Sequence, residues 1–434
     1  MIAMPPPSIS LNLQVRGMQP SATVAINERS NALLAAGRTV YKLGLGQSPF
    51  PVPASVVEAL RTYAGRKEYM PVRGHPPLRD AVAAFHQRRL QLPHEVHGED
   101  VLVGPGSKEL MFLTQLAFYG DLVLPSPSWV SYSPQARILG RQVCYLPTDP
   151  RDRWLLRPQV LHDHCVRDRD RPRVLILNYP SNPTGQTFTD DELAELAAVA
   201  RDHRMIVISD EIYGELHHTG QHRSIAVHYP EGTIISSGLS KWCGAGGWRL
   251  GTFLFPPELR WLLTAMTAVA SETYTSTSAP IQCAAVTAFE CGPEIEEYLV
   301  HARAILRAIG TWCCDALVQA GVACDRPQGG FYLFPDFTAH ADRLRARGIT
   351  GGELLCERLL AETGVAILPG SEFGRPPGDW TVRIAYVDFA GKNALNGVAR
   401  NPDITTMGVS TLRTFAGRIV AAIEQIVAWL DRAR

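Results

Sequence analysis

The feature that most restricts how this chain can fold is a series of short, unbroken apolar runs separated by helical segments. The runs lie at residues 101–103, 122–124, 174–177, 206–208, 233–235 and 250–255. A strand that is apolar at every residue is typical of a sheet covered by helices on both faces. Between the runs, Thr189 followed by Glu192 predicts a capping box at the start of a helix over residues 190–203. This alternation predicts an α/β domain with a largely parallel sheet.

A second region, which begins near Cys324, predicts a smaller α+β domain. It contains strand-like residues 330–334 and 382–386, a helical segment at 352–360 and an amphipathic helix from Leu412 to the end. The polar, Gly- and Asn-rich residues 389–411 predict a long surface loop, and residues 25–36 predict a short helix. We therefore divide the chain into a disordered or extended arm (1–24), a segment packing with the small domain (25–60), a large domain (61–323) and a small domain (324–434).

The composition indicates a globular protein and argues against several other classes. Of the 434 residues 46% are hydrophobic, and 42 basic side chains balance 42 acidic ones, which argues against nucleic-acid binding. Nine cysteines without a C-x-x-C pair favour a reducing compartment. The N-terminus lacks the pattern of a signal peptide, and no apolar run approaches the roughly 20 residues that span a bilayer. We expect a cytoplasmic protein that binds neither membranes nor nucleic acids.

Polar residues that follow the apolar runs are candidates for a ligand site, because ligands of open α/β sheets bind outside the carboxyl ends of the strands. After the first run, Gly104-Pro105-Gly106-Ser107-Lys108 could hold an anion at a helix N-terminus, although a plain turn explains such a pattern more often. After the second run, Trp129 could stack on a planar ring, although most tryptophans serve packing. Taken singly, neither pattern identifies a ligand.

The next two loops offer a rigid amide and a carboxylate. Asn182 stands between two prolines in a turn with little backbone freedom. Asp210 ends the fourth run, where an unpaired carboxylate would be costly, so we expect a cationic or protonated partner. Tyr213 could reach the same site. The alternative for Asp210 and Tyr213 is a helix N-cap with a packing tyrosine.

The fifth loop holds Lys241, and a lysine behind a buried strand is unusual because burial of its charge costs free energy. Desolvation lowers the pKa of an amine and makes it nucleophilic. Arg249 offers a planar fork suited to phosphate or carboxylate. A lone lysine is more often a surface residue. In chain order, however, the loops offer a cradle for an anion, an aromatic ring, a carboxylate and an amine. This combination fits the needs of pyridoxal phosphate.

With these residues the chain resembles the fold-type I aminotransferases of class I/II, the aspartate aminotransferase family, and in particular its prokaryotic branch. The resemblance runs from about residue 25 to the C-terminus. Its most specific segments are Ser126-Pro127-Ser128-Trp129-Val130-Ser131-Tyr132, Ser181-Asn182-Pro183-Thr184-Gly185, Ser209-Asp210-Glu211-Ile212-Tyr213, and Ser240-Lys241 with Arg249. It implies the cofactor pyridoxal 5′-phosphate, a mostly parallel seven-stranded sheet plus a smaller α+β domain, and a homodimer with shared active sites. The implied reaction is ping-pong transfer of an amino group from an L-amino acid to a 2-oxo acid.

The resemblance also implies roles for single residues. Lys241 matches the lysine that carries the cofactor and moves the substrate proton. Asp210 matches the carboxylate that keeps the pyridine nitrogen protonated. Tyr213 and Asn182 match the residues that hydrogen-bond the phenolic oxygen, and Trp129 matches the ring that stacks on the pyridine. Trp129 and Asn182 also fall at positions that border the substrate.

The remaining matches concern the phosphate group and the substrate. Phosphate-contacting positions are occupied by Gly106, Ser107, Lys108 and Arg249, and Tyr69 matches a tyrosine that reaches the phosphate of the partner subunit. Arg383 matches the arginine that clamps the substrate α-carboxylate. Gly46 falls on the segment that closes over the substrate.

Two departures from the family pattern bear on these roles. Many relatives have a serine three residues before the lysine, but this chain has Gly238, which leaves Ser240 or Ser237 as the phosphate contact. Residues 271–274 lack the arginine by which another branch recognises a distal carboxylate, so a dicarboxylate preference has no support from that segment.

Other functions remain open from the sequence. A lyase, decarboxylase or cyclase of the same fold would use the same Lys241 and Arg383. A non-catalytic, ligand-sensing domain is the alternative from another class. His162-Asp163-His164-Cys165 is the one pattern that suggests zinc, and a solvated helix face explains it better.

Overall fold

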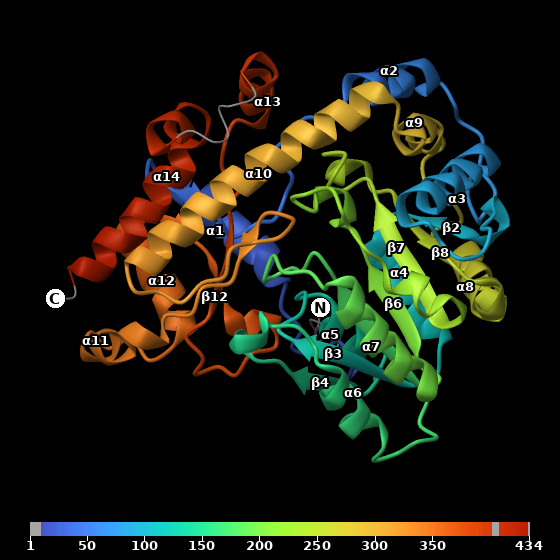
Figure 1. Cartoon of the computed structure of the whole chain (residues 1–434), viewed down its shortest axis with the longest axis horizontal. Coiled ribbons are helices and arrows are strands. Elements are labelled where there is room, and N and C mark those ends of the chain that lie inside the picture. Colours follow the sequence, from blue (N-terminus) through green and yellow to red (C-terminus); the bar gives the residue numbers. More distant parts are fainter. Residues whose placement is uncertain (1–9, 402–407, 433–434) are drawn as a thin grey trace, which may run out of the picture.

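The computed structural model describes residues 10–401 and 408–432, which form a large and a small domain connected by one long helix (Figure 1). The large domain holds a seven-stranded sheet with strand order β2-β8-β7-β6-β5-β3-β4. Its strands are β2 (Val101–Gly104), β3 (Asp121–Ser126), β4 (Val143–Pro147), β5 (Arg173–Asn178), β6 (Ile206–Asp210), β7 (Thr233–Gly238) and β8 (Gly251–Leu254). All neighbouring strands are parallel except β8, which is antiparallel to β2 and β7. The expected α/β fold is confirmed.

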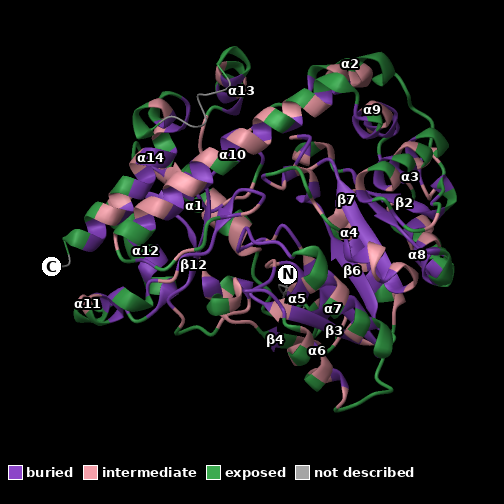
Figure 2. Ribbon diagram, viewed as in Figure 1, coloured by how far each residue is buried: buried purple, intermediate pink, exposed green. Residues whose placement is uncertain are grey.

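Helices bury both faces of this sheet, as the unbroken apolar runs predict (Figure 2). In β5, Val174 and Ile176 belong to the apolar cluster on one face, whereas Leu175 and Leu177 belong to the cluster on the other. The first cluster includes residues of α4 (Ser107–Ala117), α5 (Tyr132–Ile138) and α8 (Arg260–Glu272), and the second includes residues of α6 (Pro158–Cys165) and α7 (Asp190–Asp202). The carboxyl ends of the parallel strands therefore remain the place where a ligand can reach the sheet.

Local sequence explains where several elements begin. The predicted capping box of α7 is present: Thr189 Oγ1 accepts a hydrogen bond from the amide of Glu192, whose carboxylate accepts one from the amide of Thr189. The connecting helix α10 (Pro293–Gln319) begins with a proline and has two glutamates in its first turn, which favours a helix start. The edge strand β4 was not expected, although residues 143–146 are apolar; in the structure only Leu146 of this strand is buried.

The small domain combines short strands with helices, as expected. β1 (Tyr41–Lys42) pairs with β10 (Val365–Ala366), and a second sheet has the order β11 (Leu368–Pro369), β12 (Val382–Ala385), β9 (Tyr332–Leu333). The remaining helices of the chain are α1 (Ala22–Ala35), α2 (Ala54–Tyr63), α3 (Pro76–Leu90), α9 (Ala279–Glu290), α11 (Ala341–Ala346), α12 (Gly352–Thr363), α13 (Gly391–Arg400) and α14 (Val409–Asp431). None of the helices within the described residues combines the length and apolar character needed to cross a bilayer.

One expectation is wrong, because residues 389–411 do not form one long loop. They contain α13, whose Ala394 and Val398 are buried four residues apart on one helix face. Its Gly and Asn residues obscured this spacing. Residues 402–407 of that stretch lie outside the described residues, as do residues 1–9 of the predicted arm and the end of the predicted C-terminal helix at 433–434. The predicted boundary at residue 60 falls inside α2, which packs against α9.

Candidate active site

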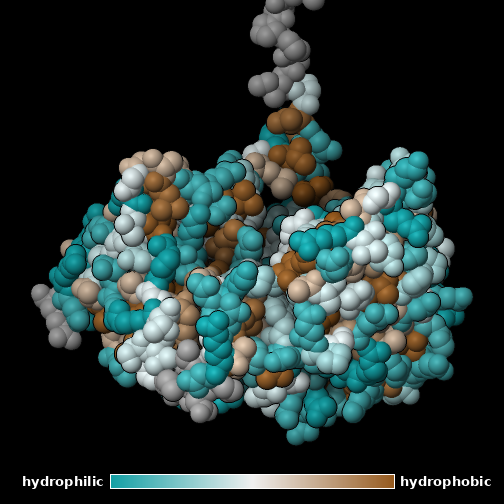
Figure 3. Space-filling view, turned by 90° about the horizontal axis from the view of Figure 1, so that it is seen from above, coloured by the Kyte–Doolittle hydropathy of each residue, from teal (hydrophilic) through white to brown (hydrophobic). Residues whose placement is uncertain are grey.

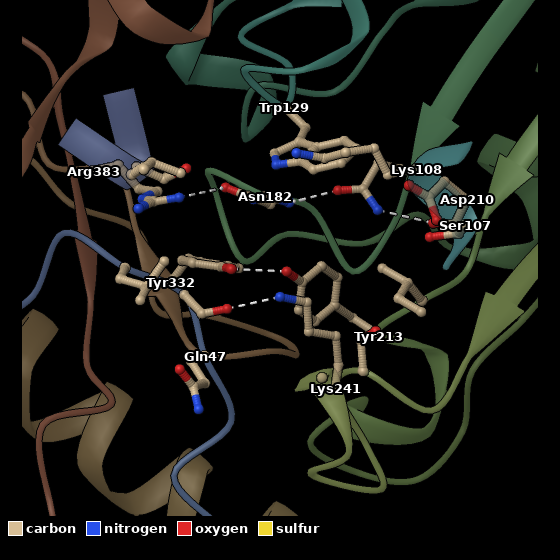
Figure 4. Close-up of a pocket in the computed structure, with 18 of the residues that line it drawn as sticks. Gln47, Ser107, Lys108, Trp129, Asn182, Asp210, Tyr213, Lys241, Tyr332 and Arg383 are labelled. Atoms are coloured by element: carbon tan, nitrogen blue, oxygen red, sulfur yellow. Dashed lines mark hydrogen bonds between the residues drawn. The ribbon is translucent and has the colours of Figure 1, made fainter. Parts of the chain in front are cut away.

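One cavity of about 540 Å³ lies at the carboxyl ends of the central strands and is closed on its other side by the small domain (Figure 4). Its volume is in the range of small-molecule sites. The predicted site residues that line it are Gly46, Ser107, Lys108, Trp129, Asn182, Asp210, Tyr213, Ser240, Lys241, Arg249 and Arg383. Gly106 lies immediately beside it. Tyr69 does not line the cavity and is 91% exposed.

Lys241 is half-buried, and its side chain lines this cavity. Its Nζ donates a hydrogen bond to the carbonyl oxygen of Gly46 at 2.7 Å and lies 5.6 Å from the centre of the Tyr213 ring. Burial and then the charge of Arg383 lower the pKa of Lys241 to about 8, and Asp210 acts in the opposite direction. A larger fraction of this amine than of an ordinary lysine is therefore neutral and nucleophilic near neutral pH.

Asp210 ends β6 and presents a buried carboxylate to the same cavity. Oδ2 accepts a hydrogen bond from the Tyr132 hydroxyl, and Oδ1 accepts one from Ser236 Oγ at 3.3 Å. Burial raises the pKa of Asp210 to about 6, although these hydrogen bonds act in the opposite direction. Within the described residues no basic side chain pairs with Asp210. The carboxylate is thus available to a protonated ring nitrogen.

Arg383 reaches the cavity from strand β12 of the small domain and is 1% exposed. Nη1 donates to Asn182 Oδ1 at 3.2 Å, and Nη2 donates to the carbonyl oxygen of Gly44. Its Nε is buried and has no hydrogen-bond partner among the described residues. Because an unsatisfied buried donor is costly, this guanidinium is suited to an incoming carboxylate.

The opposite end of the cavity is suited to an anion. Ser107 and Lys108 begin α4, so their main-chain amides belong to a helix N-terminus. Gly106 has φ +95°, and a Cβ there would lie 2.2 Å from Nη2 of Arg249, so glycine leaves room for this guanidinium. Of the two alternative serines, Ser240 lines the cavity, whereas Ser237 does not.

Several lining or supporting residues were missed in the sequence. Tyr332 hydrogen-bonds Tyr213, Asn178 donates to the main chain of Asp210 at 2.9 Å, and Tyr132 holds the Asp210 carboxylate. Tyr132 and Asn178 lie within or beside the recognised motifs, and that adjacency was the available signal. Tyr332 follows no strand of the large sheet and had no such signal.

These observations fit pyridoxal phosphate. One cavity is lined by a half-buried amine of lowered pKa, a buried carboxylate without a basic partner among the described residues, the ring of Trp129, and a helix N-terminus with a nearby guanidinium. No group of three or more His, Cys, Asp or Glu side chains that could hold a metal ion occurs in residues 10–401 and 408–432. An organic, phosphorylated carbonyl cofactor thus matches the donor set better than a metal ion does.

Comparison with known proteins agrees with this geometry. The sequence model for aminotransferase class I and II matches residues 38–392. An aspartate aminotransferase of Geobacillus stearothermophilus is 33% identical over 388 residues, which cover 87% of this chain and 94% of that protein. An aspartate/prephenate aminotransferase of Thermus thermophilus is 32% identical over 369 residues, covering 84% and 91%. The solved structure of the Thermus thermophilus aspartate aminotransferase with maleate has a TM-score of 0.79 at 31% identity and covers 91% of this chain and 100% of that one.

The chain belongs to the class I and II aminotransferases, of fold type I. It is therefore an enzyme that depends on pyridoxal phosphate and transfers an amino group between an amino acid and a 2-oxo acid. Neither the lyase, decarboxylase or cyclase alternative nor the ligand-sensing alternative finds support among these relatives.

Proposed function

We propose that the cavity is the active site of this aminotransferase and that Lys241 is its catalytic residue. The observation that carries the proposal is that the half-buried amine of Lys241, with its lowered pKa, and the buried carboxylate of Asp210 line the same cavity. Pyridoxal phosphate, when bound, supplies an electron sink for the bonds at the substrate α-carbon. The residues around it bind, orient and move protons.

Lys241 binds the cofactor covalently through Nζ. Once released by a substrate amine, the free Nζ would act as the base and acid that moves the proton of the substrate α-carbon. Such positioned proton transfer contributes about 10²–10⁴-fold. Asp210, held by Tyr132 and Ser236, keeps a proton on the pyridine nitrogen. Tyr213 donates a hydrogen bond to the phenolic oxygen.

The substrate is oriented from the small domain. Arg383 binds the α-carboxylate with its planar fork, and Asn182 holds that fork from the large domain. Trp129 stacks on the pyridine ring. The amides of Ser107 and Lys108, with Ser240 and Arg249, hold the phosphate, and residues 44–47, which include Gly46, close over the substrate.

The proposed amino donor is a dicarboxylic amino acid of the aspartate or glutamate type. The side chain of Lys108 lines the cavity, its Nζ lies 5.1 Å from the Trp129 ring centre, and it makes no ion pair with an acid of the described residues. Burial and the charge of Arg249 lower the pKa of Lys108, so this ammonium gains from an anionic partner. The names of the relatives, aspartate and aspartate/prephenate aminotransferases, support this class.

A homodimer with shared active sites would explain why the Tyr69 side chain is exposed in the single chain. This side chain is 91% exposed in the single chain, although tyrosines are more often partly buried. Apolar side chains also project from the N-terminal segment (Figure 3), namely Leu11, Leu13, Val15 and Met18. A second copy would cover both surfaces. All nine cysteines are free, which supports a reducing compartment such as the cytoplasm.

A panel of L-amino acids with 2-oxoglutarate as acceptor tests the proposed donor. We expect aspartate to give a higher kcat/KM than alanine or leucine, and we expect Lys108→Ala to lower kcat/KM for aspartate while leaving that for alanine within about twofold. Lys392→Ala, on α13, is the matched control. Equal losses for aspartate and alanine in Lys108→Ala would contradict the dicarboxylate assignment.

A further inference from the structure

The hydroxyl groups of Tyr213 and Tyr332 share a hydrogen bond of 2.7 Å across the boundary between the two domains (Figure 4). Tyr213 follows β6 of the large domain, whereas Tyr332 lies in β9 of the small domain. Both side chains line the cavity and both are buried. Their rings are perpendicular, with centres 5.5 Å apart. Since each phenol has a single proton, only one of the two hydroxyls can donate in this bond.

Either hydroxyl could donate, and the surroundings of Tyr332 favour it as the donor. The Arg383 guanidinium lies 5.0 Å from the centre of its ring, and a positive charge stabilises a phenolate. Burial raises the pKa of both phenols, but the charge of Arg383 lowers that of Tyr332 in opposition to burial. At Tyr213, burial and then Tyr332 raise the pKa far above its usual value and Asp210 adds to the rise, while Arg383 acts against it. In a pair of phenols the more acidic one is the better donor, and here it is Tyr332.

The position of Tyr332 is fixed by close packing. Its ring lies against Gly46, where a Cβ would come within 1.9 Å of the Tyr332 oxygen. Its main chain pairs with Ala385 in β12, the strand that carries Arg383. The hydroxyl therefore has little freedom to turn away from Tyr213.

We propose that Tyr332 is a positioning residue for the transamination reaction: its hydroxyl donates to the oxygen of Tyr213 and thereby leaves the Tyr213 proton free to be donated into the cavity. The inference rests on the proposed role of Tyr213 toward the phenolic oxygen of the cofactor. A hydrogen bond received by Tyr213 polarises its O–H group and strengthens the bond that it donates. Arg383, Tyr332 and Tyr213 thus form a chain from the carboxylate site to the cofactor site.

The test measures, in the holoenzyme, the pH midpoint of the absorbance change of the lysine-bound cofactor. Tyr332→Phe should raise this midpoint by about half a unit to one unit, since the hydrogen bond from Tyr213 is weakened. Tyr386→Phe is the matched control, because its hydroxyl donates to the Gly330 carbonyl oxygen at 3.3 Å and does not line the cavity; it should leave the midpoint unchanged. Melting temperatures of the cofactor-free variants confirm that each is folded.

A double-variant cycle separates this inference from the proposed function. Tyr213→Phe alone should raise the midpoint, and adding Tyr332→Phe should then raise it no further. If Tyr213→Phe shifts the midpoint but Tyr332→Phe leaves it unchanged or lowers it, the inference is overturned and the proposed function stands. A Tyr332→Phe shift of equal size in the Tyr213→Phe background also overturns the inference. If Tyr213→Phe has no effect, the proposed role of Tyr213 fails, and the inference fails with it.

Discussion

The hydroxyl of Tyr132 donates a hydrogen bond to Oδ2 of Asp210, and both side chains are buried at the base of the cavity. This bond comes from α5 and reaches the end of β6, so two elements set the orientation of one carboxylate. Because a neutral hydroxyl stabilises the ionised form of an acid, the same bond limits the rise of the Asp210 pKa that burial causes.

Replacement of Tyr132 by Phe should weaken binding of pyridoxal phosphate about tenfold. The variant leaves Oδ2 of Asp210 without its donor, and the ionised carboxylate that holds the pyridine nitrogen becomes less favourable. Equilibrium titration of the cofactor-free protein measures the change. Tyr119→Phe, at a side chain that is 75% exposed, is the control and should bind normally. Unchanged affinity in Tyr132→Phe would argue against this role of the bond.

Replacement of Lys241 by Ala should abolish covalent attachment and reduce turnover by at least about 10²–10⁴-fold. Treating the wild-type holoenzyme with borohydride and mapping its peptides should place the cofactor on the peptide that contains residue 241. Lys392→Ala should retain both attachment and turnover. If the cofactor is found instead on the peptide that contains Lys108, Lys241 is not the lysine that binds the cofactor.

The rate of covalent attachment should depend on pH through Lys241. Its pKa is lowered from 10.5 to about 8, so the neutral amine is the minor form below pH 8 and the major form above it. The rate should therefore rise about tenfold per pH unit below pH 8 and level off above. Rapid-mixing absorbance measurements on the cofactor-free protein give this rate of attachment. A rate that still rises tenfold per unit between pH 9 and 10 would contradict a lowered pKa.

Mixing two variants, each with a different active-site residue replaced, tests whether the two subunits share their active sites. Tyr69→Ala should bind the cofactor weakly, and Lys241→Ala should be inactive. In a mixed dimer, the intact Lys241 of one subunit faces the intact Tyr69 side chain supplied by the other, so activity should return at cofactor concentrations that leave Tyr69→Ala largely empty. Subunits exchanged under mild denaturation and assayed for turnover give the result. Activity that never exceeds the sum of the separate variants would argue against sharing.

The sequence predicts the sheet well because each central strand is buried on both faces and leaves an unbroken apolar run. The predicted residues Asp210, Asn182 and Lys241 lie in loops that follow such runs, and the structure brings all three to one cavity. The sequence does not predict β4, an edge strand in which only Leu146 is buried, or α13, whose Gly and Asn content resembles a loop.

The contacts that the sequence did not predict were missed for a different reason. The bond between Tyr213 and Tyr332 and the two carbonyl contacts, Gly46 to Lys241 and Gly44 to Arg383, join residues more than one hundred positions apart. Two of these three involve main-chain oxygens, which every residue carries, so no residue type marks them. The tertiary packing of segments that are far apart in the sequence brings them together.

Tyr332 and Arg383 lie on paired strands, with the guanidinium beside the phenol ring. Redesign of this enzyme for acceptors or donors without an α-carboxylate would begin by replacing Arg383, and the neighbouring phenol would lose the cation that acidifies it. On the roles proposed for Arg383 and Tyr332, substrate range and working pH should therefore be coupled. A change to the first should need a compensating change near Tyr332 to preserve the second.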